Sequence, residues 1–191
     1  MNRLLLVLPV PFRRVGNDLF FESQACNGLE RWAQNFDQID LACPVRPDSI
    51  QSPADCTMLW QNVKELSCYD NVNFIELPWA FQLPHFIQSY PQIRQILRQK
   101  IQANRYLSFG IGALVGDWAA IACLEAMRLR RPYSVWTDRV EHEVIRRTNQ
   151  ANSLKRRLKN RLMTIPLMQR YHNFVISNAS LGLFHGQDCY E

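Results

Sequence analysis

Short apolar runs alternate with longer helix-like segments along the 191-residue chain, and this alternation constrains the fold more than any other feature of the sequence. The runs are rich in Leu, Ile, Val and aromatic residues, and most are bounded by Pro, Gly, Asn or Asp, as buried strands usually are. Strands are predicted at residues 3–8, 38–43, 72–77, 106–109, 133–137 and 174–177. Helices are predicted at residues 22–35, near 56–68, and at 91–104, 116–130 and 153–163. Because this pattern is typical of βαβ units, we expect an α/β fold with a Rossmann-like open parallel sheet of about six strands and helices on both faces.

The apolar segments do not predict a membrane span or a leader. The N-terminal MNRLLLVLPVPFRR is interrupted by Pro9 and Pro11 and has no small-residue cleavage site, so we interpret it as the first strand. The six cysteines form no C-x-x-C pair and no zinc-site spacing, which favours reduced thiols in a cytoplasmic protein. We expect a single domain over residues 1–191.

The segment PYSVWTDRVEHE, residues 132–143, carries the densest cluster of titratable groups. A predicted buried strand ends there in Asp, Arg, Glu and His residues. Ligands of open α/β sheets bind outside the carboxyl ends of the strands, so these groups are candidates for chemistry. An alternative interpretation is equally open, in which the cluster is a solvated turn and Glu141 and Glu143 support the start of the next helix.

The loop after the first predicted strand lacks the glycine patterns of nucleotide-binding loops. It contains only Gly16 and Gly28, so both the G-x-G-x-x-G fingerprint and the Walker A sequence are absent. We therefore predict no dinucleotide cofactor. Gly16 and Asn17 form either a tight turn that brings the backbone close to a ligand or an ordinary turn.

A region of uniformly positive charge follows the titratable cluster. Residues 144–187 contain no Asp or Glu but eight Lys and Arg residues. Four aliphatic residues recur among them at helical spacing: Leu154, Leu158, Leu162 and Ile165. Pro166 is expected to end or kink this helix. The region from Arg146 to Arg161 predicts either contact with an anionic membrane surface or a helix whose apolar face packs on the sheet. It lacks interleaved aromatic residues, so nucleic acid is not an expected partner.

The order of these features resembles the N-terminal domain of a GT-B fold glycosyltransferase, most closely the retaining, family-four-like enzymes. The resemblance rests on the first strand, Gly-containing loop and helix at residues 4–35, on LACPVRP, on YLSFGIGALVGDWAAIACLEAMRLRRPYSVWTDRVEHEV, on the basic helix and on NFVISNASLGLF. In that family the N-terminal domain holds the acceptor, and a C-terminal domain binds the nucleotide-sugar donor across a cleft. The resemblance therefore implies an acceptor-binding half that is inactive alone, with the donor-binding domain absent from these 191 residues.

The family also implies roles for individual residues. Asp138 stands at the end of the fifth strand, where some members carry a His, and it would orient or deprotonate a hydroxyl of a sugar or lipid-linked acceptor, with His142 sharing that task. Arg139 and Glu141 are predicted to bind substrate. Gly16 and Asn17 are predicted to approach the donor, although family members commonly carry two adjacent glycines where this chain has one.

Two other classes of function stay open. The chain is alternatively a non-catalytic membrane-surface or protein-interaction module, peripheral at the inner face of a membrane. A metal-dependent hydrolase would use Asp138, Glu141, His142 and Glu143 as ligands, but such a site needs further ligands from other strand ends. The remaining histidines show no matching spacing, so no metal ion is predicted.

Overall fold

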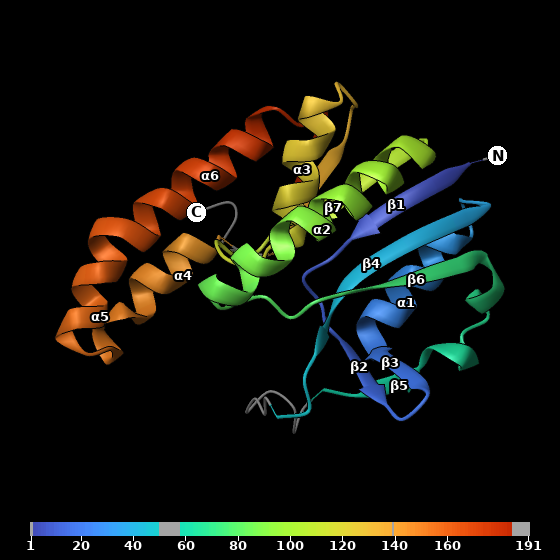
Figure 1. The fold of residues 1–191 in the computed structure, drawn as a ribbon, viewed down its shortest axis with the longest axis horizontal. Coiled ribbons are helices and arrows are strands. Elements are labelled where there is room, and N and C mark those ends of the chain that lie inside the picture. Colours follow the sequence, from blue (N-terminus) through green and yellow to red (C-terminus); the bar gives the residue numbers. More distant parts are fainter. Residues whose placement is uncertain (1, 50–57, 139, 185–191) are drawn as a thin grey trace.

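A parallel sheet forms the centre of the computed structural model, which describes residues 2–49, 58–138 and 140–184 (Figure 1). In this part of the chain six parallel strands follow the order β6-β4-β1-β7-β8-β9. These strands are β1 (Arg3–Val7), β4 (Gln38–Arg46), β6 (Val72–Leu77), β7 (Tyr106–Gly110), β8 (Ser134–Thr137) and β9 (Leu181–Phe184). Numbered by their order along the chain, these strands lie across the sheet as 3-2-1-4-5-6, the doubly wound arrangement of Rossmann-like sheets. The predicted α/β class is confirmed.

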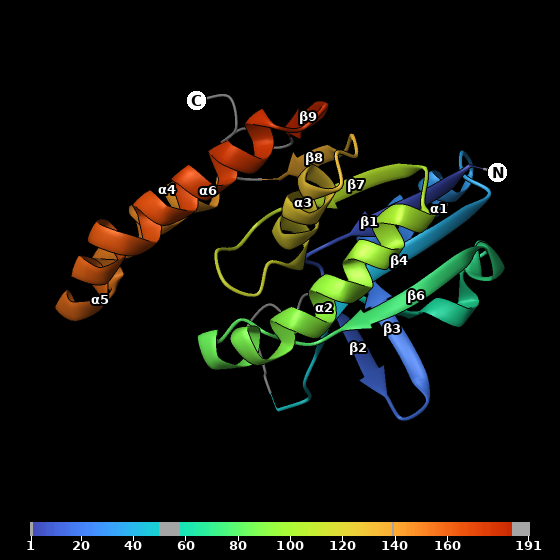
Figure 2. The same ribbon diagram turned by 45° about the horizontal axis from the view of Figure 1, so that its top comes forward.

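Strand β1 shows why both faces of the sheet are covered. Its residues from Leu4 to Val7 are all buried, and alternate side chains of a strand point to opposite faces. Leu4 and Leu6 pack in the cluster beneath α1 (Ser23–Ala33), whereas Leu5 and Val7 pack in the cluster beneath α2 (Leu83–Ala103), α3 (Trp118–Arg128) and α6 (Ile165–Ser177). Figure 2 shows α1 on one side of the sheet and the other three helices on the opposite side.

Helix α3 is apolar nearly all round and is deeply covered, as such a composition predicts. Its central acid, Glu125, is fully buried. The Glu125 carboxylate accepts a hydrogen bond of 2.6 Å from Arg94 of α2 and a second one from Arg128. This ion-pair cluster fixes α3 against α2.

The strand predicted at residues 174–177 is wrong. Those residues end α6, and the sixth parallel strand is β9, four residues further on. The buried residues of α6 show the physical reason, because they recur at helical spacings of three and four: Ile165, Met168, His172 and Val175. A short apolar run at the end of a buried helix has the composition of a strand.

An antiparallel extension of the sheet was not predicted. The hairpin of β2 (Phe12–Val15) and β3 (Asp18–Glu22) pairs with β4 on one side and with β5 (Trp60–Asn62) on the other. The helix predicted near residues 56–68 is wrong from residue 60 onward, where β5 and two 3-10 turns occur; residues 56 and 57 lie outside the described residues. The helix predicted from Pro91 begins at Leu83 instead, and Pro91 lies within it.

A long helical rod follows α4 (Glu141–Thr148). It consists of α5 (Leu154–Lys159), a π-helical turn (Asn160–Thr164) and α6. Of the two effects expected of Pro166, an end of the helix does not occur, because α6 continues to Ser177. A proline conflicts with the carbonyl four residues earlier, but the π-helical turn before it shifts the hydrogen bonding to five residues, as in the bond from Ile165 N–H to Asn160 O. Within the described ranges, no helix has the length and apolar content needed to cross a bilayer.

Candidate functional site

A cavity of about 630 Å³ lies between α1 and the sheet, on the side where β1 and β8 end. The chain moves outward from β1 in opposite directions through β4 and β7, and the crevice at such a reversal is the usual ligand site of a doubly wound sheet. Most of the wall is apolar, with contributions from the end of β1, α1, β4, β8 and β9. Its charged and amide side chains are Glu22, Gln24, Arg31 and Asp138. An apolar hollow with a few polar groups is the usual composition of a small-molecule site.

Two indole side chains contribute to the cavity wall from opposite sides, Trp32 of α1 and Trp136 of β8. The indole of Trp136 lies across Gly110 of the neighbouring strand. A Cβ atom at Gly110 would stand 2.9 Å from a ring atom of Trp136, which is closer than packed atoms approach. Gly110 therefore allows the ring to lie close against the sheet beside the cavity.

The polar groups of the wall have different local roles. The Glu22 carboxylate accepts a hydrogen bond of 2.8 Å from the Ala25 N–H, so it caps the start of α1. Arg31 lies in the last turn of α1 and is exposed. Asp138 follows the last residue of β8 and is exposed. A carboxylate at this position can accept a hydrogen bond from a hydroxyl group of a bound ligand.

The two predicted catalytic residues are not brought together. Asp138 borders the cavity, whereas His142 is not among the described residues that line it. His142 is buried in the first turn of α4, with its Nε2 3.8 Å from Oε1 of Glu143. Burial lowers the pKa of His142, and the nearby charges of His172 and Arg146 lower it further while Glu143 opposes them.

Two further residues of this cluster, Arg139 and Glu141, were predicted to bind substrate. Glu141 begins α4 and lies with Glu143 in its first turn, while Arg146 and Arg147 lie in its last turn. This arrangement matches the interpretation in which acidic residues support a helix start. Arg139 lies outside the described residues. The substrate-binding roles of both residues stay predictions.

Gly16 and Asn17 lie on the opposite half of the molecule from Asp138. They form the two-residue turn between β2 and β3, where Val15 pairs with Asp18 and Gly16 has a left-handed φ of 58°. Asn17 borders a separate hollow of about 460 Å³ beside β6, whereas Asp138 follows β8. The parallel sheet places β4, β1 and β7 between those two strands. Both residues therefore form a hairpin turn away from Asp138, and their predicted approach to the donor stays a prediction.

The loop that follows β7 is held by a buried carboxylate that was not predicted from the sequence. The buried Asp117 caps α3 by accepting from Ala120 N–H, and its second oxygen accepts from Gly112 N–H and Ala113 N–H at 2.8 and 3.0 Å. Burial raises the pKa of Asp117 above its usual value, although these three hydrogen bonds and the nearby His172 act against the shift. An Asp directly before the apolar run of α3 is the sequence signal of a helix cap.

Comparison with protein-family models and with curated protein sequences gives no match for this chain. Among the residues that the structure describes, no three His, Cys, Asp or Glu side chains come together as a metal site would require. The cluster of Asp138, Glu141, His142 and Glu143 therefore gives no geometric support to a metal-dependent hydrolase.

Proposed function

We propose that this chain is the acceptor-binding half of a GT-B fold glycosyltransferase, in which a second domain holds the nucleotide-sugar donor. The observation that carries the proposal is the cavity at the reversal point of the 3-2-1-4-5-6 sheet, with Asp138 at its border and two indoles in its wall. Sugar transfer needs an acceptor hydroxyl held at the mouth of a cleft, and this cavity offers a carboxylate for that hydroxyl.

In the proposed mechanism each described group binds one part of the acceptor. Asp138 accepts a hydrogen bond from the reacting hydroxyl and orients it, or removes its proton as the new bond forms. The indoles of Trp32 and Trp136 offer flat apolar surfaces for the C–H face of a sugar ring or for an attached apolar group. Arg31 offers a positive charge to a phosphate. A lipid-linked sugar fits this combination of apolar wall and separated charges.

His142 has a more indirect place in this proposal. Its imidazole is buried on α4 and does not border the cavity, so a direct part in acceptor chemistry requires α4 to move relative to β8. We propose that the reaction takes place in the cytoplasm, at the inner face of a membrane when the acceptor is lipid-linked.

Binding measurements on the chain by itself test the proposal. Isothermal titration calorimetry would compare a panel of soluble sugars and detergent-solubilised lipid-linked sugars with a panel of nucleotide-sugars. The proposal predicts saturable binding of at least one acceptor and no binding of nucleotide-sugars, because the donor site lies in the second domain. Binding of nucleotide-sugars without any acceptor binding would contradict it.

A further inference from the structure

An exposed row of aliphatic side chains runs along the far part of the helical rod. Leu154, Leu158 and Leu162 are 79%, 60% and 65% exposed. Met163 and Leu167 are also exposed and follow Leu158 and Leu162 by five residues. A spacing of five keeps residues on one side of a π-helix, and the π-helical turn lies at this point of the rod. We call these five residues the aliphatic stripe.

The rod already uses a different set of residues for packing. Ile165, Met168, His172 and Val175 are buried, and α6 contacts α3 and α4. The far part of the rod, α5, extends beyond the sheet beside α4 in both ribbon views (Figures 1 and 2). No residue of α5 or of the π-helical turn is buried, within the described chain. The stripe therefore does not belong to the core of this domain.

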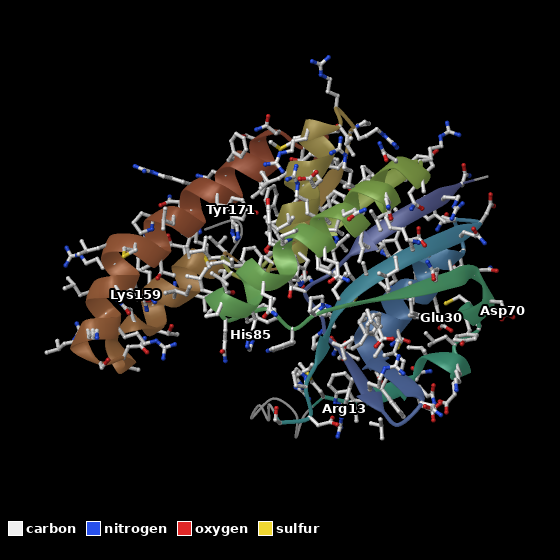
Figure 3. All side chains as sticks on the ribbon, viewed as in Figure 1. Arg13, Glu30, Asp70, His85, Lys159 and Tyr171 are labelled. Atoms are coloured by element: carbon white, nitrogen blue, oxygen red, sulfur yellow. The ribbon has the colours of Figure 1, made fainter. Side chains whose placement is uncertain are left out.

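Positive charges surround the stripe. Five exposed cations lie between Leu154 and Leu162: Lys155, Arg156, Arg157, Lys159 and Arg161. Figure 3 shows Lys159 on this projecting part of the rod, at the other end of the molecule from Asp70. The sequence has no Asp or Glu from residue 144 to residue 187, while the rest of the chain contains more acidic than basic residues. The charge of the molecule is therefore strongly polarised toward the rod.

We propose that the aliphatic stripe and its five cations dock on an anionic lipid bilayer. The aliphatic side chains enter the boundary between headgroups and acyl chains, and the cations contact lipid phosphates. Charge complementarity favours this partner over a protein. Five cations and no acidic residue surround the stripe, whereas the centre of a protein interface is depleted of charged residues overall. The acidic remainder of the molecule faces away from the anionic surface. This inference rests on the rod alone and is independent of the proposed glycosyltransferase function.

Vesicle flotation tests the proposal with the full chain. We expect the protein to float with vesicles of phosphatidylcholine and phosphatidylglycerol, and to stay unbound with phosphatidylcholine alone. Raising the salt concentration should weaken binding, because salt screens the cations from the lipid charge. Failure to bind the anionic vesicles at low salt would overturn the proposal.

Paired substitutions locate the contact. The double variant L158Q/L162Q should lower vesicle partitioning about tenfold or more, since two apolar side chains no longer leave water. The control is L83Q/I87Q on α2, whose side chains are 57% and 61% exposed at the same spacing, and it should bind like the unaltered protein. Circular dichroism would check that both variants fold.

Two results with these variants would overturn the proposal that the aliphatic stripe docks on a membrane. Equal losses in L158Q/L162Q and L83Q/I87Q would show that the stripe is not the contact, and would overturn the proposal. A change from dimer to monomer in L158Q/L162Q, measured by light scattering without any vesicle binding, would assign the stripe to self-association and also overturn it.

Discussion

Asp138 and His142 are four residues apart in the chain but face different parts of the molecule. Asp138 borders the cavity between α1 and the sheet, whereas His142 is buried in the first turn of α4. The backbone changes from strand to helix between them, so the sequence spacing of one helical turn does not apply. The cavity border therefore has a carboxylate without a neighbouring imidazole from this pair.

Replacement of Asp138 by Asn should weaken acceptor binding without loss of stability. A hydrogen bond to a charged group contributes about 1.5–3 kcal/mol, so the dissociation constant should rise about tenfold or more. Because Asp138 is exposed, its substitution should leave the unfolding midpoint unchanged. Calorimetric titration measures the first effect and urea unfolding the second. Asp70→Asn is the control, because Asp70 is exposed and is not among the described residues that line the cavity. An equal loss of affinity in both variants would contradict the assigned role.

Two glycines near the cavity should respond to Ala substitution in opposite directions. Gly110→Ala places a Cβ atom 2.9 Å from the Trp136 ring, so it should lower the free energy of unfolding by about 1–3 kcal/mol and displace the indole. Gly28 lies within α1, and a Cβ atom there would meet nothing within 4 Å. Gly28→Ala should therefore raise the free energy of unfolding by about 0.5–1 kcal/mol. Urea unfolding measures both. A Gly110→Ala variant as stable as the unaltered protein, or more stable, would show that Trp136 does not lie against Gly110.

Stability should fall in mildly acidic solution because of His142. Burial lowers its pKa in the folded protein, so the unfolded chain takes up the proton at a higher pH than the folded chain. The free energy of unfolding therefore declines as pH falls below the ordinary imidazole value of about 6.5. His142→Gln should remove that part of the decline in a series of urea unfolding curves. His85 is exposed (Figure 3), so His85→Gln should keep the full decline in stability. Identical pH profiles for the unaltered protein, His142→Gln and His85→Gln would count against a buried neutral imidazole at His142.

Glu125 should contribute more to stability than an exposed acid does. Glu125→Gln removes a fully buried carboxylate that pairs with Arg94 and Arg128. The free energy of unfolding should fall by about 1–3 kcal/mol, and no more than that, because both guanidinium groups can still reach water. Glu76→Gln, which breaks an exposed pair with Arg14, should change stability much less. The comparison is made by urea unfolding, and a similar effect of the two substitutions would argue against the buried cluster.

The centre of the parallel sheet was predictable because strands such as β1 and β4 are buried on both faces. Leu4 to Val7 of β1 are apolar without interruption, and this composition is evident in the sequence. The β2–β3 hairpin was not predictable in the same way, because Arg13 and Arg14 are exposed and the strand has no apolar alternation. Its turn signal, Gly16 and Asn17, was interpreted as a ligand-binding loop as well as an ordinary turn.

The candidate site was predictable only in part. Asp138 was identified because a charged residue directly follows a buried strand, and that signal is local. The cavity wall depends on residues far apart in the chain, such as Trp32 and Trp136, which only the folded sheet brings together. The exposure of Leu158 was equally unpredictable from spacing, because an amphipathic helix can turn its apolar side either to the core or to solvent.

Indole signals in a two-dimensional NMR spectrum test the acceptor site most directly. The chain contains five tryptophans, and Trp→Phe variants would assign their side-chain N–H signals. With a saturating acceptor, the account predicts that the signals of Trp32 and Trp136 shift while those of Trp60, Trp79 and Trp118 stay in place. Acceptor binding that moves the latter three signals and leaves Trp32 and Trp136 unchanged would contradict the assignment of this cavity as the acceptor site.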